Sequence, residues 1–264
     1  MRKDLEKNIK ERLGEIKVSN EGYEMKIIEY NNVHDILIEF QDEYKTKIRT
    51  QYSAFKNGSI KNPYHPNVCR VGYLGTGKYE PSINGKKTKC YKTWQSMLER
   101  CYDPYFINKK LTYKDCFVCK EWHNFQNFCE WFYKHYYEAE GERMCLDKDI
   151  LFKNNKIYSP ETCMIVPERI NMLFIKSDKS RGDYPIGVCW HKNANKFMAY
   201  CHILNKNNKT EARYLGLYKT SKEAFLVYKQ FKENYIKQIA DEYKDLIPKE
   251  LYNAMHRYEV EIDD

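Results

Sequence analysis

Short runs of alternating apolar and polar residues characterise the first part of the chain, residues 14–77. In Ile36–Phe40 (ILIEF), an apolar side chain recurs at every second position. This period of two is typical of a strand that buries one face. Two similar runs are Tyr23–Tyr30 and Tyr44–Thr50. The runs are separated by the turn-forming pairs Asn31-Asn32 and Asp42-Glu43. The pattern predicts a small antiparallel β module.

The second part, residues 88–175, changes to helical spacing. Apolar residues recur three and four positions apart in two groups, which are Trp94, Met97, Leu98 and Cys101, then Trp122, Phe125, Phe128, Cys129 and Phe132. This spacing places each group on one face of a helix, where we expect it to form core. Two strands and a helix are expected next, at Met144–Leu151, Glu161–Val166 and Pro167–Asn171.

The third part, residues 183–246, predicts a three-stranded sheet packed on one helix. Its strands are expected at Ile186–Lys192, Lys196–Ile203 and Glu211–Tyr218, with the first two forming a hairpin around Asn193-Ala194-Asn195. Thr220 and Glu223 have the spacing of a capping box, which marks the start of a helix. That helix carries an apolar stripe and therefore needs a sheet to cover it.

These patterns together predict an α+β fold with three modules. The chain after Pro248 ends in acidic residues and is expected to be peripheral.

The charge of the chain is concentrated in one stretch. The formal net charge is +8, and residues 176–222 contain ten basic residues against three acidic ones. Such a cluster favours a polyanionic partner, and double-stranded DNA is the partner that we expect. The alternative is a lysine-rich surface that is simply solvated.

The location of the protein follows from what the sequence lacks. No apolar run reaches the roughly 20 residues of a membrane span, and the charged N-terminus has no apolar signal core. We therefore expect no membrane partner and a cytoplasmic location. In that reducing compartment, most of the ten cysteines are expected to be small buried side chains rather than disulfides.

The third part resembles the DNA-binding domain of plant ethylene-response factors and its relatives in phage and mobile-element endonucleases. The resemblance is carried by Gly187-Val188-x-Trp190, Lys196-Phe197-x-Ala199, Leu215-Gly216-x-Tyr218, Thr220, Glu223-Ala224 and Tyr228. It implies that the sheet enters the DNA major groove, which is about 12 Å wide, while the helix supports it. The expected DNA contacts are Trp190, Lys192, Lys196, Arg213 and Tyr214, with Arg213 as the base reader because its guanidinium can bond guanine O6 and N7 together.

The second part resembles the HNH-like proteins of phages. The motifs are Trp94-x-x-Met97-Leu98-x-Arg100-Cys101-Tyr102, Val118-Cys119-x-Glu121-Trp122-x-x-Phe125, Leu146-Asp147-Lys148-Asp149, Tyr158-Ser159-Pro160-Glu161-x-Cys163 and Ile170-Asn171. The resemblance implies a degenerate ββα-metal core in which Asp147 and Asn171 bind a divalent Mg²⁺ or Mn²⁺. Lys148 stands where the family has its histidine base, and Asp149 is the alternative base or ligand. A lysine needs its pKa lowered by about 3 units to act as a base near neutrality.

A zinc site is a further hypothesis for the second part. Cys116 and Cys119 have a CxxC spacing, and His123 follows one helical turn later. A structural zinc ion takes four ligands, and Cys101, Cys145 or Cys163 would have to complete the set. The alternative, and our expectation, is that these cysteines pack among the aromatic residues.

The first part resembles a small β-barrel that often precedes HNH-like segments in phage proteins. The three resemblances together predict a phage or mobile-element protein that binds double-stranded DNA, with a homing-type HNH endonuclease as the specific activity. Two alternatives stay open. One is a non-catalytic DNA-binding regulator with a dead HNH scaffold, and the other is an anti-defence protein that binds a host defence protein.

Overall fold

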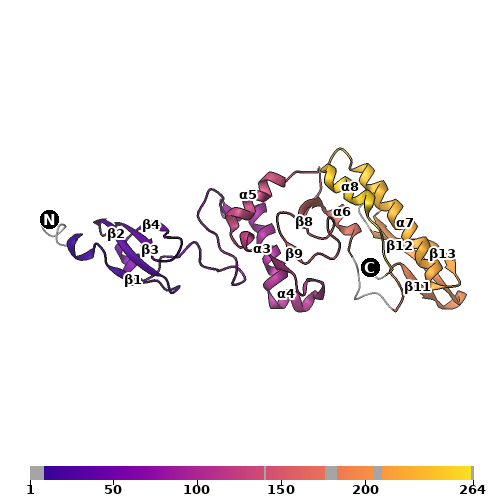
Figure 1. Cartoon of the computed structure of the whole chain (residues 1–264), viewed down its shortest axis with the longest axis horizontal. Helices are drawn as coiled ribbons and strands as arrows, with labels where there is room; N and C mark the ends of the chain where they lie inside the picture. Colours follow the sequence, from indigo (N-terminus) through magenta and orange to yellow (C-terminus); the bar gives the residue numbers. More distant parts are fainter. Residues whose placement is uncertain (1–8, 140, 176–182, 205–209, 263–264) are drawn as a thin grey trace. The chain divides into compact units, whose positions relative to one another are not determined.

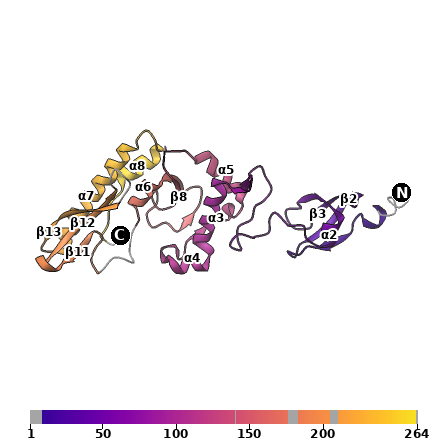
Figure 2. The ribbon, with the colours of Figure 1, turned by 180° about the vertical axis from the view of Figure 1, so that it is seen from behind.

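The computed structural model describes residues 9–139, 141–175, 183–204 and 210–262. Its fold is mixed α+β, in agreement with the sequence prediction (Figures 1 and 2). The chain forms two compact units, residues 1–133 and 134–264. The boundary falls inside the predicted segment 88–175, so the helices of that segment and its strand-strand-helix portion belong to different units. The two units are described separately.

The first unit begins with a four-stranded antiparallel sheet in the order β1–β2–β3–β4. Its strands are β1 (Ile16–Val18), β2 (Glu24–Asn32), β3 (Asp35–Phe40) and β4 (Lys47–Thr50), followed by helix α2 (Tyr52–Lys56). Ile36, Ile38 and Phe40 are fully buried, which confirms that the period-two pattern marks one face of a strand. Phe55 of α2 completes this core. Among the described strands, β1 and β4 do not pair with each other, so closure into a barrel stays a prediction.

Two helices, α3 and α5, carry the aromatic core of the first unit. The elements of this region are β5 (Ser82–Ile83), β6 (Lys86–Lys87), α3 (Lys89–Tyr102), α4 (Pro104–Lys109), η1 (Leu111–Tyr113), β7 (Phe117–Val118), η2 (Lys120–His123) and α5 (Phe125–His135). Thr88 caps α3 by accepting a hydrogen bond from the Tyr91 amide at 3.1 Å. The buried Trp94 indole donates to the Trp122 carbonyl at 2.7 Å. Both predicted helical faces are buried, as expected.

Eight of the ten cysteines are thiols, in agreement with the expectation that most do not form disulfides, and one pair is the exception. Cys90 of α3 and Cys129 of α5 form a disulfide, with their Cα atoms 5.9 Å apart. Both residues lie on the apolar faces that the helical spacing identified, and the packing of those faces brings the two sulfurs together. Sequence spacing could not pair them, because the contact depends on how α3 and α5 are packed.

The second unit contains the predicted strand-strand-helix order. Strands β8 (Met144–Asp147) and β10 (Met164–Pro167) are antiparallel, with Asp147 opposite Met164, and α6 (Glu168–Leu173) follows at once. The short strand β9 (Ile157–Tyr158) lies in the connection between β8 and β10. The order of elements is therefore confirmed, although both strands are shorter than predicted.

The three-stranded antiparallel sheet of the third part is also confirmed. It consists of β11 (Val188–His191), β12 (Lys196–Leu204) and β13 (Thr210–Tyr218), with the turn η4 (Lys192–Ala194) between the first two. Asn195 closes that turn in the left-handed conformation, with φ of 51°, which asparagine tolerates better than most residues. Thr220 and Glu223 form the capping box at the start of α7 (Ser221–Glu242), as predicted.

Helix α7 contributes to two hydrophobic cores. Its first half packs Ala224, Phe225 and Tyr228 against the β11–β12–β13 sheet. Its second half packs Ile236 and Ile239 in a core shared with β10, α6 and α8. Both views show α7 running along one side of this sheet (Figures 1 and 2).

The segment after Pro248 is not peripheral, contrary to expectation. Residues Lys249–Arg257 form helix α8, in which Leu251 and Met255 are fully buried. Val260 is buried beyond it, in the core beneath the sheet. The acidic residues at the end of the sequence obscured this apolar stripe, whose members recur at four- and five-residue spacing.

The close contact between Gly187 and Tyr228 generates a stability prediction. A Cβ atom at Gly187 would overlap the Tyr228 ring, whereas a Cβ at Gly141 would meet nothing, and both glycines have φ of 75°. Gly141→Ala should therefore cost only the left-handed strain, about 1 kcal/mol. Gly187→Ala should cost about 1–3 kcal/mol more, because it also overpacks the core. The free energies of unfolding in urea would measure the difference, and equal losses would contradict the packing argument.

Candidate functional site

The strand register assigns each residue of the C-terminal sheet to one of two faces. Residues directly opposite each other in an antiparallel pair point to the same side. Val188 pairs with Ala199, and both are buried in the core that includes α7, as is Cys201. The residues between them in each strand therefore belong to the other side, which we call the open face.

The open face carries basic, aromatic, apolar and hydroxyl-bearing residues and no acidic residue from its strands. Its members are Cys189, His191, Lys196, Met198, Tyr200, His202, Leu204, Thr210, Ala212, Tyr214 and Leu217. Tyr214 is 59% exposed, and Lys196 is exposed as well. The rings of Tyr200 and His202 are in edge contact, with centroids 5.5 Å apart. The face thus offers donors and ring surfaces without a carboxylate to repel an anion.

The five predicted DNA contacts do not share this face. Lys196 and Tyr214 lie on it, and the exposed Lys192 lies at the adjoining turn η4. Trp190 pairs with Phe197 on the helix side, where the two rings are 4.9 Å apart. Arg213 pairs with the buried Cys201 and so also starts from the helix side.

Trp190 and Arg213, although on the helix side, keep access to solvent because they lie on the outer strands, β11 and β13. Trp190 is 37% exposed and Arg213 is exposed. Either side chain can therefore still reach past the edge of the sheet. The basic residues Lys176, Lys179, Arg181, Lys206 and Lys209 of the predicted charged stretch lie outside the described residues.

In the strand-strand-helix portion, Asp147 organises the turn that follows β8. Its Oδ1 atom accepts hydrogen bonds from the amides of Asp149 and Ile150, both at 2.8 Å. Burial raises the pKa of this carboxyl above its ordinary value, and the two amide donors oppose that effect. Asp147 therefore has a structural task in addition to the metal-binding role that the resemblance implies.

Lys148 is committed to an ion pair and a backbone contact. Its side chain is only 7% exposed, and Nζ donates to both carboxylate oxygens of Asp149 at 2.8 Å. Nζ also donates to the Asn155 carbonyl. An ammonium group has three donors and no acceptor, so these three oxygens use all of its hydrogen atoms. Lys148 is therefore held by Asp149 and Asn155 in the turn after β8.

Asn155 is the partner that sequence reasoning missed. Its side-chain amide donates to the Lys148 carbonyl at 2.9 Å and to the Ile157 carbonyl at 2.7 Å. Asn155 thereby ties both ends of the loop that holds Lys148. The sequence signal for this turn is the pair Asn154-Asn155, in which Asn154 takes a left-handed φ of 63°.

Asn171, the second predicted metal ligand, lies half-buried on α6. No hydrogen bond among the described residues joins it to Asp147, Lys148 or Asp149. Within the same residues, no group of three or more His, Cys, Asp and Glu side chains is arranged to hold a metal ion. The structure therefore brings together Asp147, Lys148 and Asp149 as a hydrogen-bonded turn.

His123, the histidine of the zinc hypothesis, contacts the partly buried Tyr102. The Tyr102 hydroxyl is 3.4 Å from His123 Nε2 and receives a hydrogen bond from the Val118 amide at 3.0 Å. Burial lowers the pKa of His123, which favours its neutral form. Cys116 is buried and Cys119 is partly buried.

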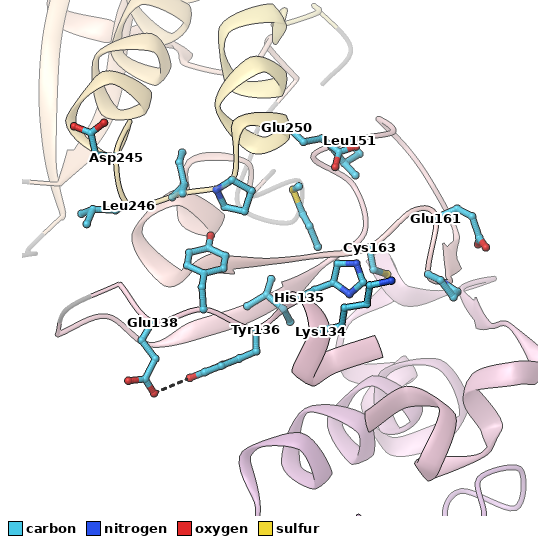
Figure 3. A pocket seen from close by; sticks show the side chains of 16 residues that line it. Lys134, His135, Tyr136, Glu138, Leu151, Glu161, Cys163, Asp245, Leu246 and Glu250 are labelled. Carbon is cyan, nitrogen blue, oxygen red and sulfur yellow. Dashed lines mark hydrogen bonds between the residues drawn. The ribbon is translucent and has the colours of Figure 1, made fainter. Parts of the chain in front are cut away.

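A separate cavity of about 750 Å³ lies in the second unit (Figure 3). Side chains from four segments line it, among them His135, Leu151, Glu161 and Leu246. None of Asp147, Lys148, Asp149 and Asn171 contributes to it, whereas Cys163, a candidate zinc ligand, lines it. The cavity therefore gives no support to Asp147 or Lys148 as part of a substrate pocket.

In comparisons with known proteins, no family model, no curated protein and no solved structure matches the chain. None of the helices in the described ranges has the length and apolar character that crossing a membrane requires.

Proposed function

We propose that the protein binds double-stranded DNA through the open face of its C-terminal sheet. The observation that carries this proposal is a sheet face whose strands contribute a lysine, two histidines and two tyrosines but no acid. A polyanion is attracted to such a face. The major groove of DNA is about 12 Å wide and can admit β-strands. The basic stretch of residues 176–222 and the resemblance to ethylene-response-factor domains support the same function.

The open face suggests a division of roles among its residues. Lys192 and Lys196 are suited to phosphate contacts, because a lysine ammonium is a flexible point charge. Tyr214 on the outer strand β13 and His202 on the central strand β12 project from the open face, and we assign them to the base edges. Arg213 starts from the opposite side of the edge strand, so we assign it to the DNA backbone rather than to a base.

The second candidate function is cleavage of that DNA by an HNH-type, metal-dependent nuclease. The order β8–β10–α6, with Asp147 ending β8, favours it. Mg²⁺ requires an octahedral set of oxygen ligands, and Mn²⁺ likewise prefers oxygen. Asp147 Oδ2 and the Asn171 side chain would supply two of these ligands. The engagement of Lys148 favours the non-cleaving alternative, in which the scaffold is kept and the base is lost. We therefore place DNA binding first and cleavage second.

The salt dependence of binding tests the proposal. If the protein neutralises around five phosphates, log K should fall with log salt at a slope of about −4.5. Fluorescence anisotropy of a labelled duplex over a series of salt concentrations would give the slope. A slope near zero would instead favour the alternative in which the partner is a protein, such as a host defence protein.

The face assignment is tested by two neighbouring residues of β13. Tyr214→Ala should cost about 1–3 kcal/mol on a preferred sequence and relax the preference there, because it removes a base contact. Arg213→Ala should weaken binding uniformly across sequences and make the salt slope about one unit less steep, as for a phosphate contact. Binding to a randomised duplex library would separate the two effects. A loss of sequence preference with Arg213→Ala alone would overturn the assignment.

Cleavage is tested with supercoiled plasmid in Mg²⁺ and in Mn²⁺. We expect the unmodified protein to bind without nicking, since Lys148 donates its hydrogen atoms to Asp149 and Asn155. Lys148→His places a histidine where the HNH-like family has its base. If the scaffold can cleave, this variant should nick the plasmid. Nicking by the unmodified protein that Asp147→Ala abolishes, with DNA affinity unchanged, would establish the second candidate function.

A further inference from the structure

A small pocket in the first unit is lined mainly by tyrosine rings. It has a volume of about 280 Å³ and lies where the β3–β4 turn meets the chain around residues 64–73. Tyr23, Tyr44, Tyr64 and Tyr73 line it, together with the carboxylates of Asp42 and Glu43. None of these residues has a part in the DNA-binding proposal.

The rings form two walls inclined to each other. Tyr44 and Tyr64 are stacked in parallel, with centroids 3.7 Å apart and an interplanar angle of 5°. Tyr73 is tilted by 47° to Tyr64 and by 51° to Tyr44, with centroids 5.6 Å and 6.4 Å away. Aromatic faces carry a negative quadrupole, so inclined rings converge their attraction on a cation.

Hydrogen bonds hold the Tyr64 and Tyr23 rings and the backbone of Tyr73 before any ligand arrives. The Tyr64 hydroxyl bonds Thr76 Oγ1 at 3.0 Å, and the Tyr23 hydroxyl is 3.3 Å from His65 Nδ1. The backbone of Tyr73 bonds the His123 carbonyl and the Phe125 amide, both at 2.9 Å. A pocket whose walls are already ordered avoids part of the entropic cost of binding.

The charge of the pocket also favours a cation. Asp42 accepts hydrogen bonds from Asn62 Nδ2 at 2.6 Å and from the amides of Tyr44 and Lys45 at 3.1 Å, all of them uncharged donors. Within the described part of the chain, no ion pair neutralises Asp42 or Glu43. Arg70 and His123 also line the pocket, so its lining contains two acidic residues and one arginine.

We propose that this pocket binds an alkylated ammonium group such as trimethylammonium. An unmodified ammonium is strongly hydrated and would have to give up its water, whereas methyl groups can contact the ring faces directly. An anion would be opposed by Asp42 and Glu43, and a bare metal ion would find ring faces in place of ligands. The group has two sources, a methylated lysine of another protein or a small molecule of the choline type.

The decisive experiment compares a cation with a neutral molecule of the same shape. Choline and 3,3-dimethylbutan-1-ol would be titrated into the full-length chain, with the Tyr ring signals followed by NMR. Choline should bind about tenfold more tightly, because only the cation interacts with the ring quadrupoles and the carboxylates. Equal affinities would reduce the pocket to an apolar cleft and overturn the proposal, and so would the absence of binding by both a trimethyllysine peptide and choline.

Variants with matched controls exclude an effect on folding. Tyr73→Leu should lower choline affinity about tenfold, while Tyr73→Phe, which keeps the ring, should retain it. Arg70→Gln should raise the affinity, since it removes the one cation of the lining. Loss of binding in Tyr73→Phe as large as in Tyr73→Leu would contradict the ring mechanism.

Peptides that contain lysine or trimethyllysine identify the source. Tighter binding of the trimethyllysine peptide than of choline would assign the site to a protein partner, and the reverse order to a small molecule. Equal binding of the methylated and unmodified peptides would count against recognition of the alkylated group.

Discussion

The second unit depends on the apolar surface of a single helix, α7, which packs on two cores at once. Tyr228 and its neighbours bury the inner face of the sheet, while Ile236 and Ile239 enter the core around β10, α6 and α8. Burying an aromatic or branched aliphatic side chain contributes about 1.5–3 kcal/mol, so either half alone would leave a small and marginal core. The sheet and the strand-strand-helix portion are therefore held together by shared packing rather than by a linker.

This sharing decides which surface of the sheet can serve a ligand. Because α7 covers one side, the open face is the side that remains accessible, and we propose that DNA binds there. Helix α7 also favours glycine at position 187, because the Tyr228 ring occupies the space that a Cβ atom there would need. Gly187 belongs to the motif that resembles ethylene-response-factor domains, and core packing explains this glycine without reference to DNA.

Local patterns in the sequence predicted the elements well. The alternation in β3, the capping box of Thr220 and Glu223, and the strand-strand-helix order all depend on interactions between residues close in the chain. The contacts that sequence reasoning missed depend on packing or on side-chain partners further away. The Cys90–Cys129 disulfide needs the packing of α3 on α5, and the Lys148 ammonium needs a carbonyl seven residues later.

The faces of β13 show most directly why the candidate site could not be read from alternation alone. Tyr218 pairs with Phe197 and faces the helix, so counting back in twos would put Tyr214 on that side and Arg213 on the open face. A bulge intervenes, because the register shifts by one residue between Ala199 and Tyr200. A single extra residue exchanges the two faces of a strand beyond it. Tyr214 consequently joins Tyr200 on the open face, and Arg213 turns toward the side of α7, so the two predicted contacts on β13 start from opposite sides of the sheet.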